Sequence, residues 1–405
     1  MTLHNTTYDL TDTLEVASKL GKVHGITRNA DVTQFSNVNL PVWVSLRPNA
    51  KCLSQSAGKG MCSDSALVSA IMEGIEVDVS ENVNHLNACY LTTEESRNSK
   101  TSCINIDEHP LQACIPSSQK IPWLEGKCLR TEKTYLIPAD MLSLDFTLTG
   151  NNMDRPRQFR TTSNGLASGR TYVEACVSGL LEVIERHSIT LTNMLTGDLK
   201  KIVVENSCPP RLASVLEELD RQDINVNIYD STVVGGVHAI EAFIWSPTGI
   251  VPPVHGFGCS LNLETAILRA VLEANQASTL LLSGSRDDLT KHTYLMTADA
   301  QRVASSFKRR VKLSVDLQRS DFSAPDLTPV EELASIINKV TNYLDREILV
   351  YRFTPEDYPV SVCKVLVPTM EGYLNAGYKP QHKLVGMKIQ EDFSTGLKLA
   401  AGGRS

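Results

Sequence analysis

The sequence lacks several features that would assign it to a familiar class. Its ten cysteines include no CxxC pair, which argues against a zinc cluster. No stretch approaches the roughly 18 uninterrupted apolar residues of a membrane span. Neither GxxxxGKS/T nor GxGxxG occurs, so the chain carries no P-loop and no dinucleotide-binding fingerprint.

Positive charge is also scarce, with 39 Lys and Arg against 46 Asp and Glu, giving a net charge of −7. This balance disfavours nucleic acid or an anionic membrane as the main partner. The N-terminal MTLHNTTYDLTDTLEV is polar and acidic, unlike a signal peptide, so we expect reduced thiols and a cytoplasmic protein. The 405 residues, 42% apolar and 21% charged, suffice for one large globular domain or two of common size.

One helical pattern occurs three times, as ALVSAIMEGIE at 66–76, ACVSGLLEVIE at 175–185 and AILRAVLEANQ at 266–276. In each copy polar residues recur at i, i+4 and i+7, which places them on one stripe of a helix. These slots hold Ser69, Glu73 and Glu76; Ser178, Glu182 and Glu185; and Arg269, Glu273 and Gln276. The other residues are mostly apolar, so core helices are predicted at about 63–83, 172–193 and 263–283.

Carboxylates on core helices need a counter-charge, because burying an unpaired carboxylate is costly and two glutamates three residues apart repel. Metal ions and basic side chains between the helices would supply it, and glutamates favour a hard ion such as Mg²⁺ over zinc. Mg²⁺ held by carboxylates usually also binds phosphate. The expected metal ligands are Glu73, Glu76, Glu182, Glu185 and Glu273. Three ordinary helices with surface glutamates are the alternative, which the recurrence disfavours.

Glycine-bearing stretches precede each of these helices, at 58–60, 163–169 and 256–258. We interpret them as turns whose backbone N–H groups can approach an anion, with Lys59 adding positive charge. Arg286, just after the third helix, is a candidate phosphate clamp, because a guanidinium can grip phosphate through two hydrogen bonds. A helix C-cap turn is the alternative interpretation of that segment.

The remainder predicts a mixed α/β (α+β) fold. Strands are expected at 31–33, 41–46, 200–204, 225–229, 347–353 and 360–367. A helix at 210–222 between two of them suggests a βαβ-like unit, and residues 296–345 look charged and mostly helical.

The expected domain organisation is a single domain over residues 1–390. It begins with an N-terminal extension, 1–21, that contains a short helical pattern closed by Gly21. Residues 84–160 are interpreted as a loop-rich insertion, since they are polar and weakly periodic. The tail, 391–405, is expected to be disordered.

Taken together, these blocks resemble the YcaO superfamily. The resemblance rests on GITRNADVT, LPVWVSLRPNA and GKG before the first helix, TTSNGLASG and EACVSGLLEVIERHS at the second, and AILRAVLEANQ with GSRDD at the third. It covers roughly residues 22–290 in order, with a further match at Val367, Pro368 and Glu371. It implies a YcaO-type fold, in which β-sheets pack with helices and three pseudo-repeated acidic helices surround an ATP/Mg²⁺ site.

The resemblance also implies which residues contact the cofactors. The family's ATP/Mg²⁺ slots fall here on Ser69, Glu73, Glu76, Ser178, Glu182, Glu185, Arg186, Glu273 and Gln276. Lys59 and Arg286 are then expected phosphate contacts and, with Arg186, the candidates for stabilising charge in the transition state. No general base is assigned, because a structural role is expected for both His187 and His255.

YcaO proteins use ATP to activate a peptide backbone amide. A nucleophile attacks the amide carbonyl, the resulting oxyanion takes the γ-phosphoryl group, and phosphate then leaves. A neighbouring Cys, Ser or Thr gives a thiazoline or oxazoline, whereas sulfide gives a thioamide. The resemblance therefore implies an ATP-dependent cyclodehydratase or thioamide synthetase acting on a ribosomally made peptide, as in natural-product (RiPP) biosynthesis. The alternatives are a catalytically silent ATP-binding accessory or regulatory protein, and an ATP-grasp ligase, which the order of the blocks disfavours.

Two departures from the family pattern affect this interpretation. Val77 stands where many relatives have arginine, and Arg28 or Arg47 is expected to compensate. The end KIQEDFSTGLKLAAGGRS lacks the Pro-x-Pro-x-Pro of many azoline-forming members, as does the thioamide-forming branch associated with TfuA proteins. No peptide-docking or sulfur-delivering module is evident, so a separate TfuA-like or E1-like partner is expected for a precursor peptide with a leader. Homodimers are frequent in the family.

Overall fold

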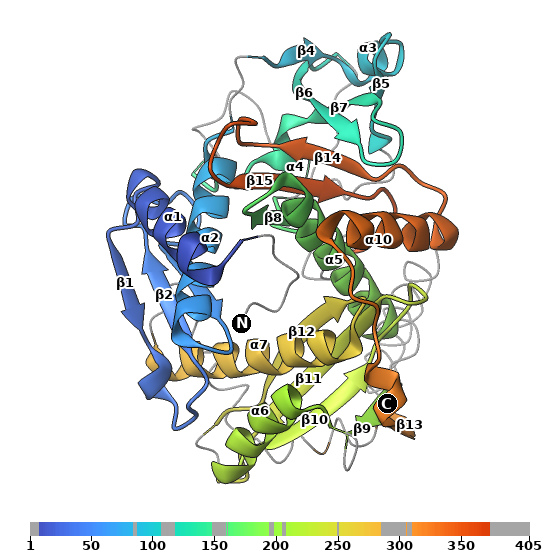
Figure 1. Ribbon diagram of the computed structural model, residues 1–405. Helices are drawn as coiled ribbons and strands as arrows, with labels where there is room; N and C mark the ends of the chain where they lie inside the picture. The colour runs from blue at the N-terminus through green and yellow to red at the C-terminus, as the bar shows by residue number, and fades with distance from the viewer. Residues whose placement is uncertain are drawn as a thin grey trace, which may run out of the picture.

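The computed structural model describes residues 8–83, 87–106, 118–147, 159, 161–193, 198–204, 208–248, 251–284, 305 and 310–372. Within this part of the chain, eight α-helices and three β-sheets form a mixed α/β fold, so the expected fold class is confirmed (Figure 1). None of the described helices is both long and apolar enough to cross a bilayer.

The N-terminal region forms a three-stranded antiparallel sheet in the order β1-β2-β3. Its strands are β1 (Arg28–Asp31), β2 (Val42–Leu46) and β3 (Gln55–Lys59), with a 3₁₀ turn, η1 (Thr33–Phe35), after β1. Helix α2 (Ser63–Glu81) packs on β2 and β3, and α1 (Leu10–Val23) packs on α2. Helix α1 is longer than expected: Asp9 caps its start, Gly21 lies inside it, and Gly25 with φ +78° follows its end.

A seven-stranded sheet combines strands that are distant in the sequence, in the order β5-β7-β6-β14-β15-β8, with β4 also pairing β6. Its strands are β4 (Cys89–Leu91), β5 (Ser102–Cys103), β6 (Ile121–Cys128), β7 (Thr134–Pro138), β8 (Leu166–Gly169), β14 (Leu349–Arg352) and β15 (Ser361–Leu366). The short helices α3 (Thr93–Arg97) and α4 (Ala139–Leu142) accompany it. Helix α5 (Tyr172–Leu191) packs on β8 and β15, and α10 (Pro329–Tyr343) packs on α5.

The third sheet has five strands in the order β12-β11-β10-β9-β13. They are β9 (Leu199–Val203), β10 (Asn225–Asp230), β11 (His238–Trp245), β12 (Val254–Ser260) and β13 (Val311–Asp316), followed by the 3₁₀ turn η5 (Arg319–Phe322). Helix α7 (Leu263–Ser283) packs on β11 and β12, and α6 (Pro210–Arg221) contacts α7 and β10.

Two expectations about this sheet are wrong. Strands β9 and β10 are antiparallel, so the segment is not a βαβ unit. Apolar periodicity indicates a strand but not its direction. The charged stretch 296–345 contains β13, which pairs parallel to β9, because a strand that is exposed along most of its length carries no apolar alternation to reveal it.

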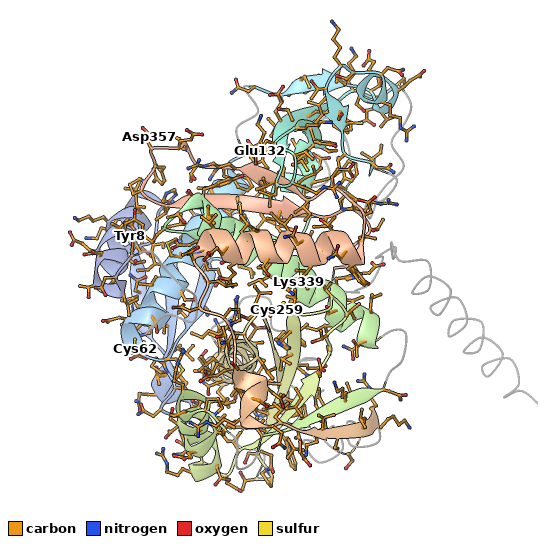
Figure 2. All side chains as sticks on the ribbon, turned by 45° about the vertical axis from the view of Figure 1, so that its right-hand side comes forward. Tyr8, Cys62, Glu132, Cys259, Lys339 and Asp357 are labelled. Atoms are coloured by element: carbon orange, nitrogen blue, oxygen red, sulfur yellow. The ribbon has the colours of Figure 1, made fainter. Side chains whose placement is uncertain are left out.

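The three acidic helices begin at the predicted residues, each with a capping interaction. The Cys62 and Ser65 side chains form a reciprocal capping box at α2, and Thr171 with Glu174 does the same at α5. Asn262 accepts the Thr265 N–H at the start of α7. Figure 2 labels Cys62 and Cys259, which lie at the entrances to α2 and α7.

The glycines of the first and third stretches lie mostly in strands, so their interpretation as turns is wrong: Gly58 belongs to β3 and Gly258 to β12. In the second stretch, residues 164–165 do form a turn before β8. A Cβ at Gly58 would lie 2.1 Å from the Ala66 carbonyl oxygen, and one at Gly258 would lie 2.2 Å from that of Ala266. Glycine is needed here because strand and helix backbones touch, leaving no room for a methyl group.

Candidate functional site

The three acidic helices surround the middle of the molecule, and each packs on the strand that precedes it in the chain (Figure 1). Strand β3 supports α2, β8 supports α5, and β12 supports α7. The threefold repeat itself stays a prediction, but this strand-to-helix arrangement brings segments more than 180 residues apart into one region. The ion pair between Lys59, at the end of β3, and Glu273, on α7, documents that proximity, with 2.8 Å between Nζ and Oε2.

On each acidic helix, the side chains of the predicted polar stripe are partly exposed, whereas most of the other side chains are buried. Apolar neighbours such as Ile75, Ile184 and Val271 expose 0% of their surface. Half-buried positions include Ser69, Glu76, Ser178, Glu182, Glu185, Arg186, Glu273 and Gln276, while Glu73 is exposed. The polar slots are therefore neither packed into the core nor scattered over the outer surface.

A backbone N–H from the preceding strand orients the middle glutamate of two of these helices. The Ala57 N–H donates to Glu73 at 2.7 Å, and the Phe257 N–H donates to Glu273 at 3.3 Å. On the third helix, the nearby Gly165 backbone N–H acts to lower the pKa of Glu182 against the raising effect of burial. Close contact between strand and helix thus places main-chain N–H groups beside these carboxylates.

The remaining glutamates, Glu76 and Glu185, have strongly raised pKa values. Burial, with the charges of Glu73 and Glu182 nearby, raises the pKa of Glu76 to about 8, although the Ser168 N–H and hydroxyl donate to it at 2.8 and 2.6 Å. Burial and the charge of Glu273 raise the pKa of Glu185 to about 8. The residues keep some exposed surface, but protein surrounds their carboxylates.

These mutual effects identify one acidic cluster, which we define as Glu73, Glu76, Glu182, Glu185 and Glu273. Burial and the charge of Glu273 raise the pKa of Glu182 as well, against the opposing effect of Arg186. The predicted convergence of carboxylates from three separate helices is therefore present in the structure. Its negative charge is only partly compensated by the protein, because two carboxylates have pKa values near 8.

Protein cations lie directly on two members of the cluster. Lys59 contacts Glu273, and the Arg186 guanidinium lies 2.7 Å from Glu182. Arg269, in the first slot of α7, donates to the Cys259 carbonyl at 3.3 Å and counters the raised pKa of Glu185. Ser69, Ser178 and Gln276 lie on the same stripes, whereas Arg286 lies outside the described residues.

The two histidines near the motifs make the structural contacts expected of them. His187 is 1% exposed, its Nδ1 accepts the Glu371 N–H at 2.9 Å, and its Nε2 lies 3.0 Å from the Tyr343 hydroxyl. His255 pairs through Nδ1 with Glu241 at 2.7 Å. Neither contact is with the acidic cluster, so no general base is assigned from them.

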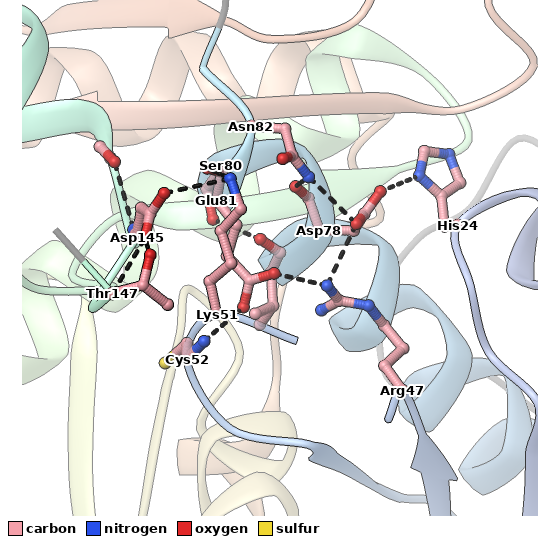
Figure 3. Close-up of polar contacts among 12 residues, drawn as sticks. His24, Arg47, Lys51, Cys52, Asp78, Ser80, Glu81, Asn82, Asp145 and Thr147 are labelled. Carbon is pink, nitrogen blue, oxygen red and sulfur yellow. Dashed lines mark hydrogen bonds and ion pairs between the residues drawn. The ribbon is translucent and has the colours of Figure 1, made fainter. Parts of the chain in front are cut away.

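Arg47 serves a different part of α2 from the one expected. It is 4% exposed and bridges Asp78 and Glu81 at 3.1 and 2.5 Å (Figure 3). His24 pairs with Asp78, and Lys51 pairs with Asp145 beside them. We call His24, Arg47, Lys51, Asp78, Glu81 and Asp145 the ion-pair network. Arg28 is exposed on β1, so neither arginine is seen compensating for Val77 at the cluster.

One relevant residue was missed by sequence reasoning. Lys364, on β15, is fully buried, and its charge counters the raised pKa of Glu182. A single lysine inside the apolar run VSVCKVLVP was the available signal. Ser168 was quoted within a motif but given no role, and it holds Glu76.

The donor set fits Mg²⁺ brought with a nucleotide. No three acidic, His or Cys side chains in the described ranges are grouped closely enough to hold a metal by themselves. Mg²⁺ needs no such cage, because it commonly takes one or two carboxylates and completes its shell with water and phosphate oxygens. The raised pKa values of Glu76 and Glu185 show that the cluster favours added positive charge.

Comparisons with known proteins agree with this geometry. A family model described as YcaO cyclodehydratase, ATP- and Mg²⁺-binding, matches residues 57–371. An uncharacterized protein in the tfuA 3′ region of Rhizobium leguminosarum bv. trifolii is 28% identical over 379 residues, spanning 87% of this chain and 86% of that protein.

Solved structures share the fold at low sequence identity. A heterocyclase in complex with substrate and cofactor has a TM-score of 0.75 and 20% identity, over 91% of this chain and 53%, about half, of that one. The YcaO protein of Methanopyrus kandleri bound with AMPPCP and Mg²⁺ has a TM-score of 0.69 and 20% identity, over 93% and 96%. The E. coli microcin synthetase McbBCD complex gives 0.66 and 18%, over 90% and 94%.

The family match begins within β3 and ends after β15, so it includes all three acidic helices. The chain therefore belongs to the YcaO family of cyclodehydratases, whose cofactors are ATP and Mg²⁺.

Proposed function

We propose that this chain uses ATP and Mg²⁺ to O-phosphorylate a backbone amide of a ribosomally made peptide, giving an azoline or a thioamide. The observation that carries the proposal is the acidic cluster, in which carboxylates from three helices lie close enough to influence one another's pKa values. Within the described residues, ion pairs join Lys59 to Glu273 and Arg186 to Glu182. Such a cluster suits a metal-bound triphosphate, whose transfer chemistry depends on positioning and charge neutralisation.

In this proposal Glu73, Glu182 and Glu273 provide metal ligands, and backbone N–H groups already orient Glu73 and Glu273. Bound Mg²⁺ would supply charge neutralisation on the transferred phosphoryl group. Lys59 and Arg186 rest on carboxylates in this structure and are within the same region, so they are suited to turn toward phosphate oxygens. Ser69, Ser178 and Gln276 are proposed nucleotide contacts, as is Arg286.

The reaction follows from the family's chemistry. A nucleophile adds to the amide carbon, and the former carbonyl oxygen takes the γ-phosphoryl group as ATP becomes ADP. The carbon–oxygen bond then breaks with phosphate as the leaving group. A Cys, Ser or Thr side chain of the peptide gives the azoline, and sulfide gives the thioamide.

A separate partner protein is part of the proposal. The Rhizobium relative lies in a tfuA region, and the McbBCD neighbour is a complex, which supports a partner for leader recognition or sulfur delivery. We propose a TfuA-like partner, with an E1-like one as the alternative.

The test incubates the purified chain with ATP, Mg²⁺ and a candidate precursor peptide, with and without sulfide and partner, and measures peptide mass. A loss of about 18 Da indicates cyclodehydration, and a gain of about 16 Da indicates exchange of oxygen for sulfur. Full activity of the chain alone would contradict the need for a partner. Nucleotide binding with no mass change under any of these conditions would instead favour the silent accessory role.

A further inference from the structure

A charged residue lies in the centre of the seven-stranded sheet. Strand β15 reads SVCKVL, and Lys364 within it exposes 0% of its surface. It pairs in register with Tyr351 on β14 and Leu166 on β8, so strands flank it on both sides. Burying an ammonium group is costly unless it is well paired, so the partners that hold Lys364 are informative about its role.

The ammonium group of Lys364 donates a hydrogen bond to the Thr162 carbonyl. Thr162 opens the short turn that leads into β8, which we call the 162–165 turn. The Leu166 N–H donates to the Ser163 carbonyl at 2.8 Å, and the Val365 N–H donates to the Gly165 carbonyl at 2.8 Å. Strand β15 therefore grips both ends of this turn, once through a side chain and once through its backbone.

The same turn lies beside a carboxylate of the acidic cluster. On α5, a Cβ at Gly179 would lie 2.7 Å from the Gly165 carbonyl oxygen, and a Cβ at Gly165 would lie 2.9 Å from the Val183 side chain. These two α5 residues flank Glu182 in the sequence, and the Gly165 backbone acts to lower the pKa of Glu182. Gly165 adopts φ +77°, which favours glycine. The turn is thus packed between β15 and α5, so a displacement of it alters the surroundings of Glu182.

We propose that Lys364 is a positioning residue for the cluster carboxylates: by holding the 162–165 turn against α5, it keeps the Gly165 backbone beside Glu182. This inference rests on the proposed function. Lys364 is 0% exposed, so it acts in this proposal through the turn. The role proposed for Lys364 is that of an outer-shell group in a metal site, which orients a metal ligand without contacting the metal.

The experiment measures nucleotide binding as a function of Mg²⁺ concentration, with a fluorescent ATP analogue, together with thermal unfolding. Lys364→Met should raise the Mg²⁺ concentration for half-maximal binding about tenfold, the usual loss for an outer-shell group. Its melting temperature should fall somewhat, because the Thr162 carbonyl loses its buried donor. Lys364→Arg, which keeps a charged donor, should remain within about threefold of wild type. Ser361→Ala, on the same strand but remote from the turn, is the control and should not change.

Gly179→Ala tests the same link from the opposite side, without altering Lys364. The added methyl pushes on the turn, while alanine favours the helix, so the Mg²⁺ requirement should rise about tenfold in a folded protein. This variant decides the matter if Lys364→Met does not fold.

The inference is overturned if folded Lys364→Met and Gly179→Ala keep the wild-type Mg²⁺ requirement. It is also overturned if Lys364→Met weakens nucleotide binding equally with and without Mg²⁺, as a merely structural lysine would. A wild-type chain that binds no Mg²⁺-nucleotide would mark a failure of the proposed function instead.

Discussion

Helix α2 carries two pairs of carboxylates, and the two members of each pair are three residues apart. The two pairs lie in opposite electrostatic environments. Asp78 and Glu81 belong to the ion-pair network, where the buried Arg47 bridges them at 3.1 and 2.5 Å (Figure 3). Glu73 and Glu76 belong to the acidic cluster, where further glutamates from α5 and α7 raise the pKa of Glu76. Arg47 spans the first pair, whereas in the second pair burial and neighbouring carboxylates drive Glu76 to take up a proton. The difference separates carboxylates that hold the fold from those available to an external cation.

The largest effect is expected at the pair that Arg47 spans. Arg47→Met leaves two buried or half-buried carboxylates without their shared cation, so the free energy of unfolding should fall by about 3–5 kcal/mol. Urea denaturation measures this. The exposed Arg28→Met serves as the control and should have little effect. The comparison fails if the Arg47 variant is as stable as wild type.

The opposite behaviour is expected at the cluster. Glu76→Gln should lower peptide modification about 100-fold, because it removes an expected Mg²⁺ ligand and with it the metal's stabilisation of phosphoryl charge. Its melting temperature should stay equal or rise, since the pKa of Glu76 is about 8 and the side chain is already mostly neutral at pH 7. Glu81→Gln, five residues further along the same helix, should lose stability yet keep activity per folded molecule. If Glu76→Gln and Glu81→Gln changed activity and melting temperature equally, the proposed difference between the two carboxylate pairs would be wrong.

The pH dependence offers a sharper comparison. The pKa values of Glu76 and Glu185 are raised to about 8 in the folded chain, above their ordinary value, so the folded state holds more protons than the unfolded one. Their stabilising effect is complete below the ordinary pKa and is lost as pH rises toward 8. Binding of Mg²⁺-nucleotide should release these protons, so its affinity should rise with pH by up to about tenfold per pH unit for each proton released. Calorimetry in buffers of different ionisation enthalpy counts the protons, and an absence of release at pH 7 would contradict the assignment.

The smallest effect is expected for the cation that rests on the cluster. Lys59 and Glu273 form a partly exposed pair, with side chains 24% and 34% exposed, so Lys59→Met should change stability by less than about 1 kcal/mol. Nucleotide affinity should fall about threefold, because one point charge near the phosphates is lost. Titration with an ATP analogue measures the affinity. An increase in affinity would instead show that Lys59 competes with the metal for Glu273.

Sequence alone located the acidic helices and their polar stripes, because Ala and Leu patterns at a period of 3.6 are local information. It misassigned Gly58 and Gly258, since a glycine required by a touching helix and a glycine required by a turn look the same in one dimension. It also could not assign Arg47, whose partners Asp78 and Glu81 become apparent only when β2 is placed beside α2. Lys364 escaped notice for the same reason: its contact with Thr162 spans 202 positions.

The strand glycines have a consequence for how this protein can vary. At Gly58 and Gly258 the distance between strand and helix is set by main-chain atoms in contact, so no larger residue can be accommodated by repacking neighbours. A helix seated in this way resists sliding along its strand by even a fraction of a turn. The charges it displays therefore keep a fixed spacing while the surrounding hydrophobic residues remain open to exchange.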